Sequence, residues 1–161
     1  METNDVMEVE INLNAKDRER AMFYNYFIRR KLVLFEVIFV ALLGVAAIVI
    51  KLADLWSGMP NGLFYVGIAI VVVLAFFLFY IKLLASAGGV GKTRYVTITP
   101  QALTTRVSGE KKEFTVKWEN FAHVAKTKYN YLFYPDMSQY LIIPRRYFTL
   151  EEQQLINSYL R

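Results

Sequence analysis

Two long apolar runs dominate the pattern of hydrophobic and polar positions along this chain. The first covers residues 32–50 and contains one charge, Glu36, and the second covers residues 63–84 and contains only Lys82, near its end. Each run is about as long as a helix that crosses a bilayer, which needs ~20 apolar residues. The residues between the runs include Gly, Pro, Asn and Ser, which favour turns. The pattern therefore predicts a transmembrane helical hairpin that leaves both chain ends on one side of the membrane.

The distribution of Lys and Arg predicts which side this is. Six basic residues precede the first run, and Lys82, Lys92 and Arg94 lie at or after the end of the second, whereas the turn between the runs has Lys51 alone. Because cytoplasmic segments carry the excess of Lys and Arg, we expect both termini in the cytoplasm. Mostly polar residues precede the first run, which argues against a cleaved signal peptide.

The residues after the hairpin alternate between apolar and polar side chains with the period of a β-strand. We expect six strands, at residues 94–99, 102–108, 114–118, 121–128, 131–134 and 140–143. Thr149 and Glu152 form a capping-box pattern and predict a closing helix. Residues 6–13 alternate in the same way, and the hairpin would bring them to the same side of the membrane. We therefore expect them to join the C-terminal sheet as a seventh strand.

These patterns divide the chain into four parts. They are a cytoplasmic strand and juxtamembrane helix (1–31), the hairpin (32–84), a Gly-rich linker (85–93) and a soluble domain (94–161). The expected fold class is an α+β membrane protein.

The linker contains SAGGVGKT, residues 86–93, which nearly matches a phosphate-binding loop. Ser86 stands in place of the first glycine, and the expected strand follows where such a loop needs a helix N-terminus. We interpret this segment as a flexible linker in which Gly88, Gly89 and Gly91 let the domain reorient.

Composition and charge narrow the function. The chain has no cysteine and a single histidine, His123, which argues against thiol catalysis, thiolate metal sites and histidine-based chemistry. We therefore expect neither catalysis nor a cofactor. Residues 94–161 carry ten basic and six acidic side chains, an excess that suits anionic membrane lipids. Nucleic acid is not an expected partner, because these basic residues are dispersed along strands and form no arm or recognition helix.

Two groups of side chains in the soluble domain are candidates for binding. Arg145 and Arg146 could bind lipid phosphates or an acidic partner, since paired guanidinium groups suit anions, or they could be a solvated pair in the turn before the last helix. Tyr131 and Tyr134 lie in an aromatic segment that could form an exposed recognition surface or one side of a half-buried strand.

The two charges in the apolar runs are a further candidate site. Glu36 and Lys82 lie near the same end of the hairpin, where they could form an ion pair within the membrane. A carboxylate in a membrane can also belong to an ion pathway. Two helices supply too little wall for such a pathway unless the protein forms a homo-oligomer. Ala41, Gly44 and Gly67 would permit close helix contacts.

The arrangement of two spans, a short linker, six strands and a final helix resembles the YcxB-like membrane proteins. The most specific residues for this resemblance are Trp118, Phe121, Val124, Ile142, Ile143, Pro144, Arg145, Arg146 and Phe148. The resemblance implies a pleckstrin-homology-like (PH-like) β-sandwich or barrel of seven strands, closed by the C-terminal helix. It also implies a bacterial inner-membrane location and supplies no catalytic residues.

Three functions remain open. The first is a scaffold or sensor whose PH-like domain binds a protein or lipid at the cytoplasmic face. The second is immunity against a membrane-active toxin or bacteriocin, an analogy at the level of the fold. The third is a small transporter or transporter-accessory subunit that depends on Glu36.

Overall fold

The computed structural model describes residues 6–87, 91–137 and 139–160. The chain divides into two compact units. Met1–Ala21 and Ser86–Arg161 form a mixed α/β unit, and Met22–Ala85 forms a helical unit.

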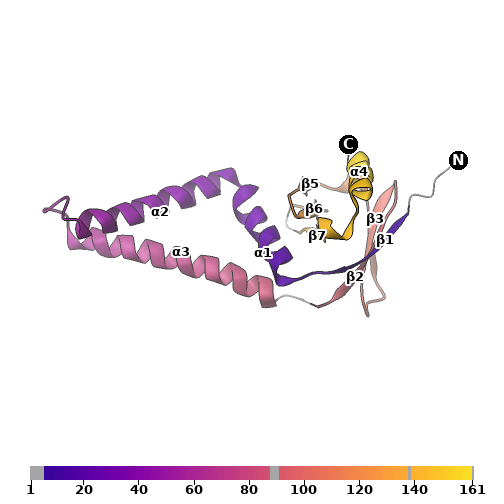
Figure 1. Ribbon diagram of the computed structural model, residues 1–161, viewed down its shortest axis with the longest axis horizontal. Coiled ribbons are helices and arrows are strands. Elements are labelled where there is room, and N and C mark those ends of the chain that lie inside the picture. The colour runs from indigo at the N-terminus through magenta and orange to yellow at the C-terminus, as the bar shows by residue number, and fades with distance from the viewer. Residues whose placement is uncertain (1–5, 88–90, 138, 161) are drawn as a thin grey trace. The chain divides into compact units, whose positions relative to one another are not determined.

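The helical unit contains the two expected long helices. They are α2 (Lys31–Leu52) and α3 (Asn61–Ala87), and a short π-helix, η1 (Tyr24–Ile28), precedes them (Figure 1). Both are long and apolar enough to cross a membrane, and only 6% of the most apolar stretch of each is buried. Their apolar side chains therefore do not form the core of a soluble fold within the described residues.

Two glycines let α2 and α3 approach each other closely. A Cβ atom on Gly67 would lie 2.8 Å from the carbonyl oxygen of Gly44, and a Cβ on Gly44 would lie 2.9 Å from Cγ2 of Ile70. Real Cβ atoms do not approach other heavy atoms this closely, so a side chain at either position would push the helices apart. The expectation that small residues permit helix contact is confirmed at these two positions.

The α/β unit consists of two antiparallel sheets and a terminal helix (Figure 1). The first sheet has the order β1-β2-β3-β4, formed by Met7–Asn12, Thr93–Ile98, Ala102–Val107 and Glu113–Lys117. The second has the order β5-β6-β7, formed by His123–Lys126, Asn130–Tyr134 and Leu141–Pro144. The remaining elements are α1 (Ala15–Phe23), η2 (Trp118–Asn120), η3 (Arg145–Tyr147) and α4 (Leu150–Tyr159).

The predicted N-terminal strand is confirmed. β1 pairs with β2 along its whole length, from Asn12 opposite Thr93 to Met7 opposite Ile98. The six predicted C-terminal strands are also present, although β5 is shorter than expected. It ends because the Thr127 hydroxyl bonds the backbone of Asn130 and starts a turn. The predicted capping box at the start of α4 is present as well.

A closed barrel is not found among the described strands. β4 is paired with β3 and β5 with β6, and η2 separates β4 from β5. In this turn the Trp118 indole N–H donates to the Thr99 carbonyl at 2.8 Å, which fixes the chain where it leaves the first sheet. The family resemblance implies a β-sandwich or a barrel, and of these two the barrel is not found in this part of the chain. The observed arrangement is two separate sheets.

The segment expected to be a linker is partly helical. α3 continues to Ala87, so the first residues of the segment belong to a helix. Gly88 and Gly89 lie outside the described residues, and the flexible-linker interpretation stays a prediction. β2 begins directly after Lys92, as expected for a segment that is not a phosphate-binding loop.

Apolar side chains from both sheets and from α4 form the core of the α/β unit. The fully buried ones include Ile11, Val96, Ile98, Leu103, Leu132, Ile143 and Ile156. All five residues of β6 are buried, unlike those of β1 to β4. β6 is therefore the central strand of the second sheet and is covered on both faces.

Candidate functional site

Arg145, the first residue of η3, is held by the turn after β5 and by α4. Its guanidinium donates to Oε1 of Gln153 on α4 at 2.9 and 2.6 Å, and to the carbonyl of Thr127 after β5 at 3.2 Å. The Gln153 amide donates back to the Arg145 carbonyl at 3.1 Å. Arg145 therefore joins the turn after β5 to the start of α4 and is not a freely solvated side chain.

Arg146 is paired with a residue that the sequence analysis missed. Its guanidinium bonds the Asp17 carboxylate, 129 positions away in the sequence, and donates to the Asn12 carbonyl at 3.2 Å. This charge-assisted bond with Asp17 raises the pKa of Arg146. Tyr147 also donates to the Asn12 carbonyl, at 2.8 Å. The turn before α4 is thus attached to the N-terminal segment.

Asp17 is buried and also caps helix α1. Its carboxylate accepts from the Asn14 N–H at 3.2 Å, and the Asn14 side chain accepts from the Asp17 N–H at 2.8 Å. This reciprocal pair is a capping box, a pattern that can be read from an Asn followed three residues later by an Asp. The start of α1 could therefore be predicted from Asn14 and Asp17 in the sequence, but the pairing of Asp17 with Arg146 could not.

The residues around these contacts line a cleft of about 400 Å³. We call it the basic cleft, and its lining residues are Asp17, Arg20, Lys128, Tyr129, Arg145, Arg146, Phe148 and Gln153. Four cationic side chains meet one carboxylate there, and that carboxylate is bound to Arg146. The basic cleft therefore carries a net positive charge.

Two of these cations lie close to one exposed aromatic ring. The Arg20 guanidinium lies 3.6 Å from the centroid of the Tyr129 ring, and Nζ of Lys128 lies 5.4 Å from the same centroid. Tyr129 is 44% exposed. Neither cation has an acidic partner within the described residues.

The other aromatic candidates have a structural role. Tyr131 and Tyr134 are fully buried, so an exposed recognition surface formed by them is wrong. The Tyr131 hydroxyl lies 3.4 Å from the Gln153 carbonyl on α4, and burial raises the pKa of this hydroxyl. The physical reason for the difference is that β6 is a central strand, whereas Tyr129 precedes it in an exposed turn.

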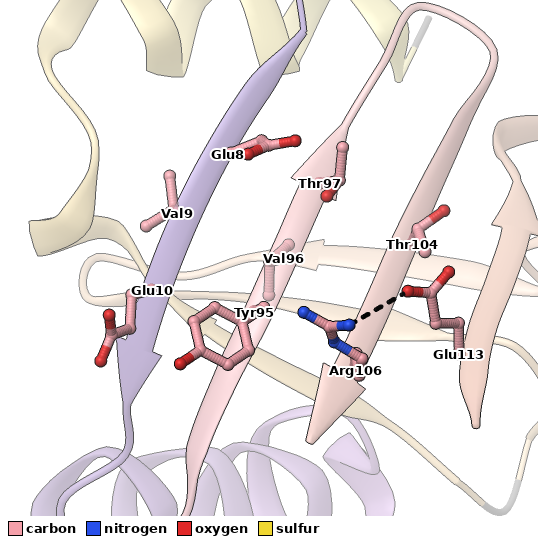
Figure 2. A pocket seen from close by; sticks show the side chains of 9 residues that line it. All are labelled: Glu8, Val9, Glu10, Tyr95, Val96, Thr97, Thr104, Arg106 and Glu113. Atoms are coloured by element: carbon pink, nitrogen blue, oxygen red, sulfur yellow. Dashed lines mark ion pairs between the residues drawn. The ribbon is translucent and has the colours of Figure 1, made fainter. Parts of the chain in front are cut away.

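A second concave surface lies on the outer face of the first sheet (Figure 2). It has a volume of about 360 Å³ and receives side chains from β1 to β4. The strand register places Glu10, Tyr95, Arg106 and Glu113 in one row across the sheet. Arg106 and Glu113 form an ion pair at 3.8 Å. With Glu8 also on this surface, carboxylates outnumber cations, so the surface is acidic where the basic cleft is positive.

The remaining predicted site lies in the helical unit. Glu36 is on α2 and Lys82 is on α3, and both side chains are exposed. Their ion pair remains a prediction.

The fold and the clefts define the class of protein to which this chain belongs. Proteins of this class contain a small α/β unit of two antiparallel sheets, whose sequence is interrupted by two apolar helices of membrane-spanning length. Residues 98–160 match the family model described as YcxB-like protein. The family resemblance expected from the sequence is confirmed over this segment, which runs from the end of β2 through α4. No curated protein and no solved structure matches the chain.

Proposed function

We propose that this chain is a non-enzymatic integral membrane protein of the bacterial inner membrane. Its helical hairpin anchors a PH-like domain at the cytoplasmic face, and the domain binds lipid or protein there. α2 and α3 cross the membrane in this proposal, and the α/β unit is the domain.

The pairing of β1 with β2 carries the proposal. These strands are neighbours in one sheet, yet both apolar helices lie between them in sequence. A chain that crossed the membrane once would leave the two strands on opposite sides, where they could not pair. Two crossings return the chain to the same side, so a membrane-spanning hairpin is compatible with the observed register.

The order of elements supports a PH-like domain. A four-stranded sheet is followed by a three-stranded sheet and then by a C-terminal helix, as the family resemblance implies. The positive charge near the predicted inner ends of the helices supports the cytoplasmic orientation.

The chemistry of the basic cleft supports binding and not catalysis. Its side chains offer positive charge, hydrogen-bond donors and an aromatic face. Its one carboxylate, Asp17, already accepts from Arg146 and from the Asn14 N–H, which leaves it poorly placed to act as a general base.

Cysteine labelling tests the anchor and its orientation. Because the chain has no cysteine, Ser57→Cys in the turn between the helices and Ser108→Cys after β3 each introduce a unique thiol, and both positions are exposed. In intact inner-membrane spheroplasts, a membrane-impermeant maleimide should label position 57, whereas position 108 should react only after permeabilisation. The reverse pattern would overturn the orientation. Extraction of the protein by alkaline carbonate without detergent would overturn the membrane anchor.

A further inference from the structure

We propose that the basic cleft binds the phosphate of an anionic phospholipid headgroup, with Arg20 and Lys128 as the cations that contact it. This inference rests on the proposed function, which places the domain at a membrane surface. It also moves the binding residues away from Arg145 and Arg146, the pair that the sequence singled out.

Hydrogen bonding separates the two pairs of cations. The guanidinium of Arg145 is occupied by Gln153 and by a backbone carbonyl, and that of Arg146 by Asp17 and Asn12. These two arginines add to the positive potential, but three of the five N–H groups of Arg145 and at least two of those of Arg146 already have partners within the protein.

The structure gives Arg20 and Lys128 no comparable polar partner among the described residues. Both lie near the Tyr129 ring, at 3.6 and 5.4 Å from its centroid. A cation near an aromatic face keeps its charge and can still donate hydrogen bonds from its outer edge. Two positive charges therefore meet in the cleft without a carboxylate to balance them.

The turn that carries Lys128 and Tyr129 is held in place before any ligand binds. The Thr127 hydroxyl donates to the Asn130 carbonyl at 2.8 Å and accepts from the Asn130 N–H at 2.9 Å. The buried Asn130 side chain donates to the Asp17 carbonyl on α1 at 3.2 Å. This bond ties the turn to the helix that supplies Arg20. A site that is ordered in advance loses less conformational entropy when it binds.

The two cations suit a phosphate. An Arg offers a planar fork of N–H donors that matches phosphate oxygens, and a Lys supplies a compact positive charge beside it. The exposed Tyr129 and Lys128 leave the cleft open to solvent, so that a headgroup can enter from a surface. Arg20 also lies two residues before Met22, where the helical unit begins in the sequence. Basic residues close in sequence to a membrane span are attracted to anionic lipids.

Lipid titration of the full chain in dodecylmaltoside tests the proposal, and native mass spectrometry resolves each bound lipid. The probes are dioctanoyl phosphatidylglycerol, dioctanoyl phosphatidylcholine and inorganic phosphate. We expect the wild type to bind phosphatidylglycerol selectively. The variant with both Arg20→Gln and Lys128→Gln should bind it roughly 10- to 30-fold more weakly, since each cation near an anionic headgroup contributes about fivefold.

Two control variants distinguish a loss of affinity at the cleft from a loss caused by lower net charge or by unfolding. Lys111→Gln with Lys112→Gln removes the same charge from an exposed turn outside the cleft and should leave the affinity within about twofold. Arg20→Lys with Lys128→Arg keeps both charges and should retain most of the binding.

Several outcomes would overturn the inference. An equal loss in the Lys111 and Lys112 variant would show that binding follows net charge, and unchanged binding in the variant with both Arg20→Gln and Lys128→Gln would show that these cations do not form the site. Equal binding of phosphatidylcholine would exclude recognition of the anionic headgroup. Phosphate binding as tight as that of phosphatidylglycerol would identify a free anion as the ligand. Absence of any lipid binding would also overturn the inference. The cysteine labelling reports on the membrane anchor separately, so failure of this inference can be distinguished from failure of the proposed function.

Discussion

The contact between Asp17 and Arg146 predicts that the N-terminal segment stabilises the C-terminal domain. Asp17 has a side chain that is 2% exposed, whereas that of Arg146 is 44% exposed. The carboxylate joins the first turn of α1 to the turn before α4. Its removal should therefore lower the stability of the whole α/β unit and not only of α1.

The size of the effect follows from the two roles of the carboxylate. A hydrogen bond to a charged group contributes about 1.5–3 kcal/mol, and the exposure of Arg146 places this one near the lower end, because solvent screens the pair. Loss of a helix cap costs about 1 kcal/mol. Asp17→Ala should therefore destabilise the domain by about 2–3 kcal/mol. Asp17→Asn keeps an amide oxygen for the Asn14 N–H and should cost about 1–2 kcal/mol.

Urea unfolding in detergent measures this effect, with Trp118 as the reporter of the domain in a Trp56→Phe background. Trp118 is suitable because its indole is bonded to the Thr99 carbonyl. A double-mutant cycle of Asp17→Asn and Arg146→Met should give a coupling energy of about 1–2 kcal/mol. Glu119→Gln is a matched control. Its exposed pair with Lys117 spans 3.8 Å and should contribute less than about 0.5 kcal/mol.

The reasoning would be refuted by a coupling energy below about 0.3 kcal/mol, the level at which independent sites add. A loss in the Asp17 variant that persists when Arg146 is already replaced would assign the whole effect to the helix cap.

Three other predictions follow from single contacts. Gly67→Ala should lower the thermal midpoint of the helices in detergent and cost about 1–3 kcal/mol, because its Cβ would meet the Gly44 carbonyl at 2.8 Å. Gly62→Ala is the control, since a Cβ there has nothing within 4 Å, and it should leave the midpoint unchanged. Equal effects of the two variants would contradict the close packing of the helices. Burial raises the pKa of Tyr131, so its stabilising contribution is complete below the unfolded value of about 10 and is lost as the pH rises through the higher folded value. Tyr131→Phe should therefore make urea stability fall less steeply above pH ~10, and an unchanged slope would refute this. Thr149→Ala removes the capping box of α4, costs about 1 kcal/mol and should speed amide exchange in its first turn, whereas unchanged exchange would contradict the role of the cap.

The strands could be predicted from the sequence because their pattern is local. Alternation with a period of two marks one buried face, and short turns such as Ser108-Gly109 join neighbours, with Gly109 at a φ of +83°. Even the addition of residues 6–13 to the C-terminal sheet was expected from the hairpin, although the pattern did not identify β2 as the partner strand. The sequence pattern was weakest at β6, where NYLFY is buried throughout and so does not alternate. A short run without alternation is typical of a strand covered on both faces.

The basic cleft could not be predicted because its residues meet only through the tertiary fold. Arg20 comes from α1 and Lys128 from the turn after β5, and no local spacing relates them. The adjacent arginines at 145 and 146 gave a stronger sequence signal, but adjacency does not show which N–H groups are already bonded. In the folded protein this pair of arginines is bonded to Gln153 and Asp17. The two cations near Tyr129 have no acidic partners among the residues described.

If the basic cleft binds lipid, the N-terminal strand is required for that binding. A deletion of this strand distinguishes binding by the geometry of the cleft from attraction by net charge alone. Deleting residues 2–12 removes four carboxylates and no cation, so the protein becomes more positive. If phosphatidylglycerol were attracted by net charge alone, this variant should bind it more tightly. The structure predicts the opposite, because Asn12 bonds Arg146 and Tyr147, and β1 holds α1, and with it Arg20, against the domain. We expect a severalfold loss of affinity together with faster proteolysis of the domain. Tighter binding would show that the cleft acts only as a region of positive charge and that its geometry is irrelevant.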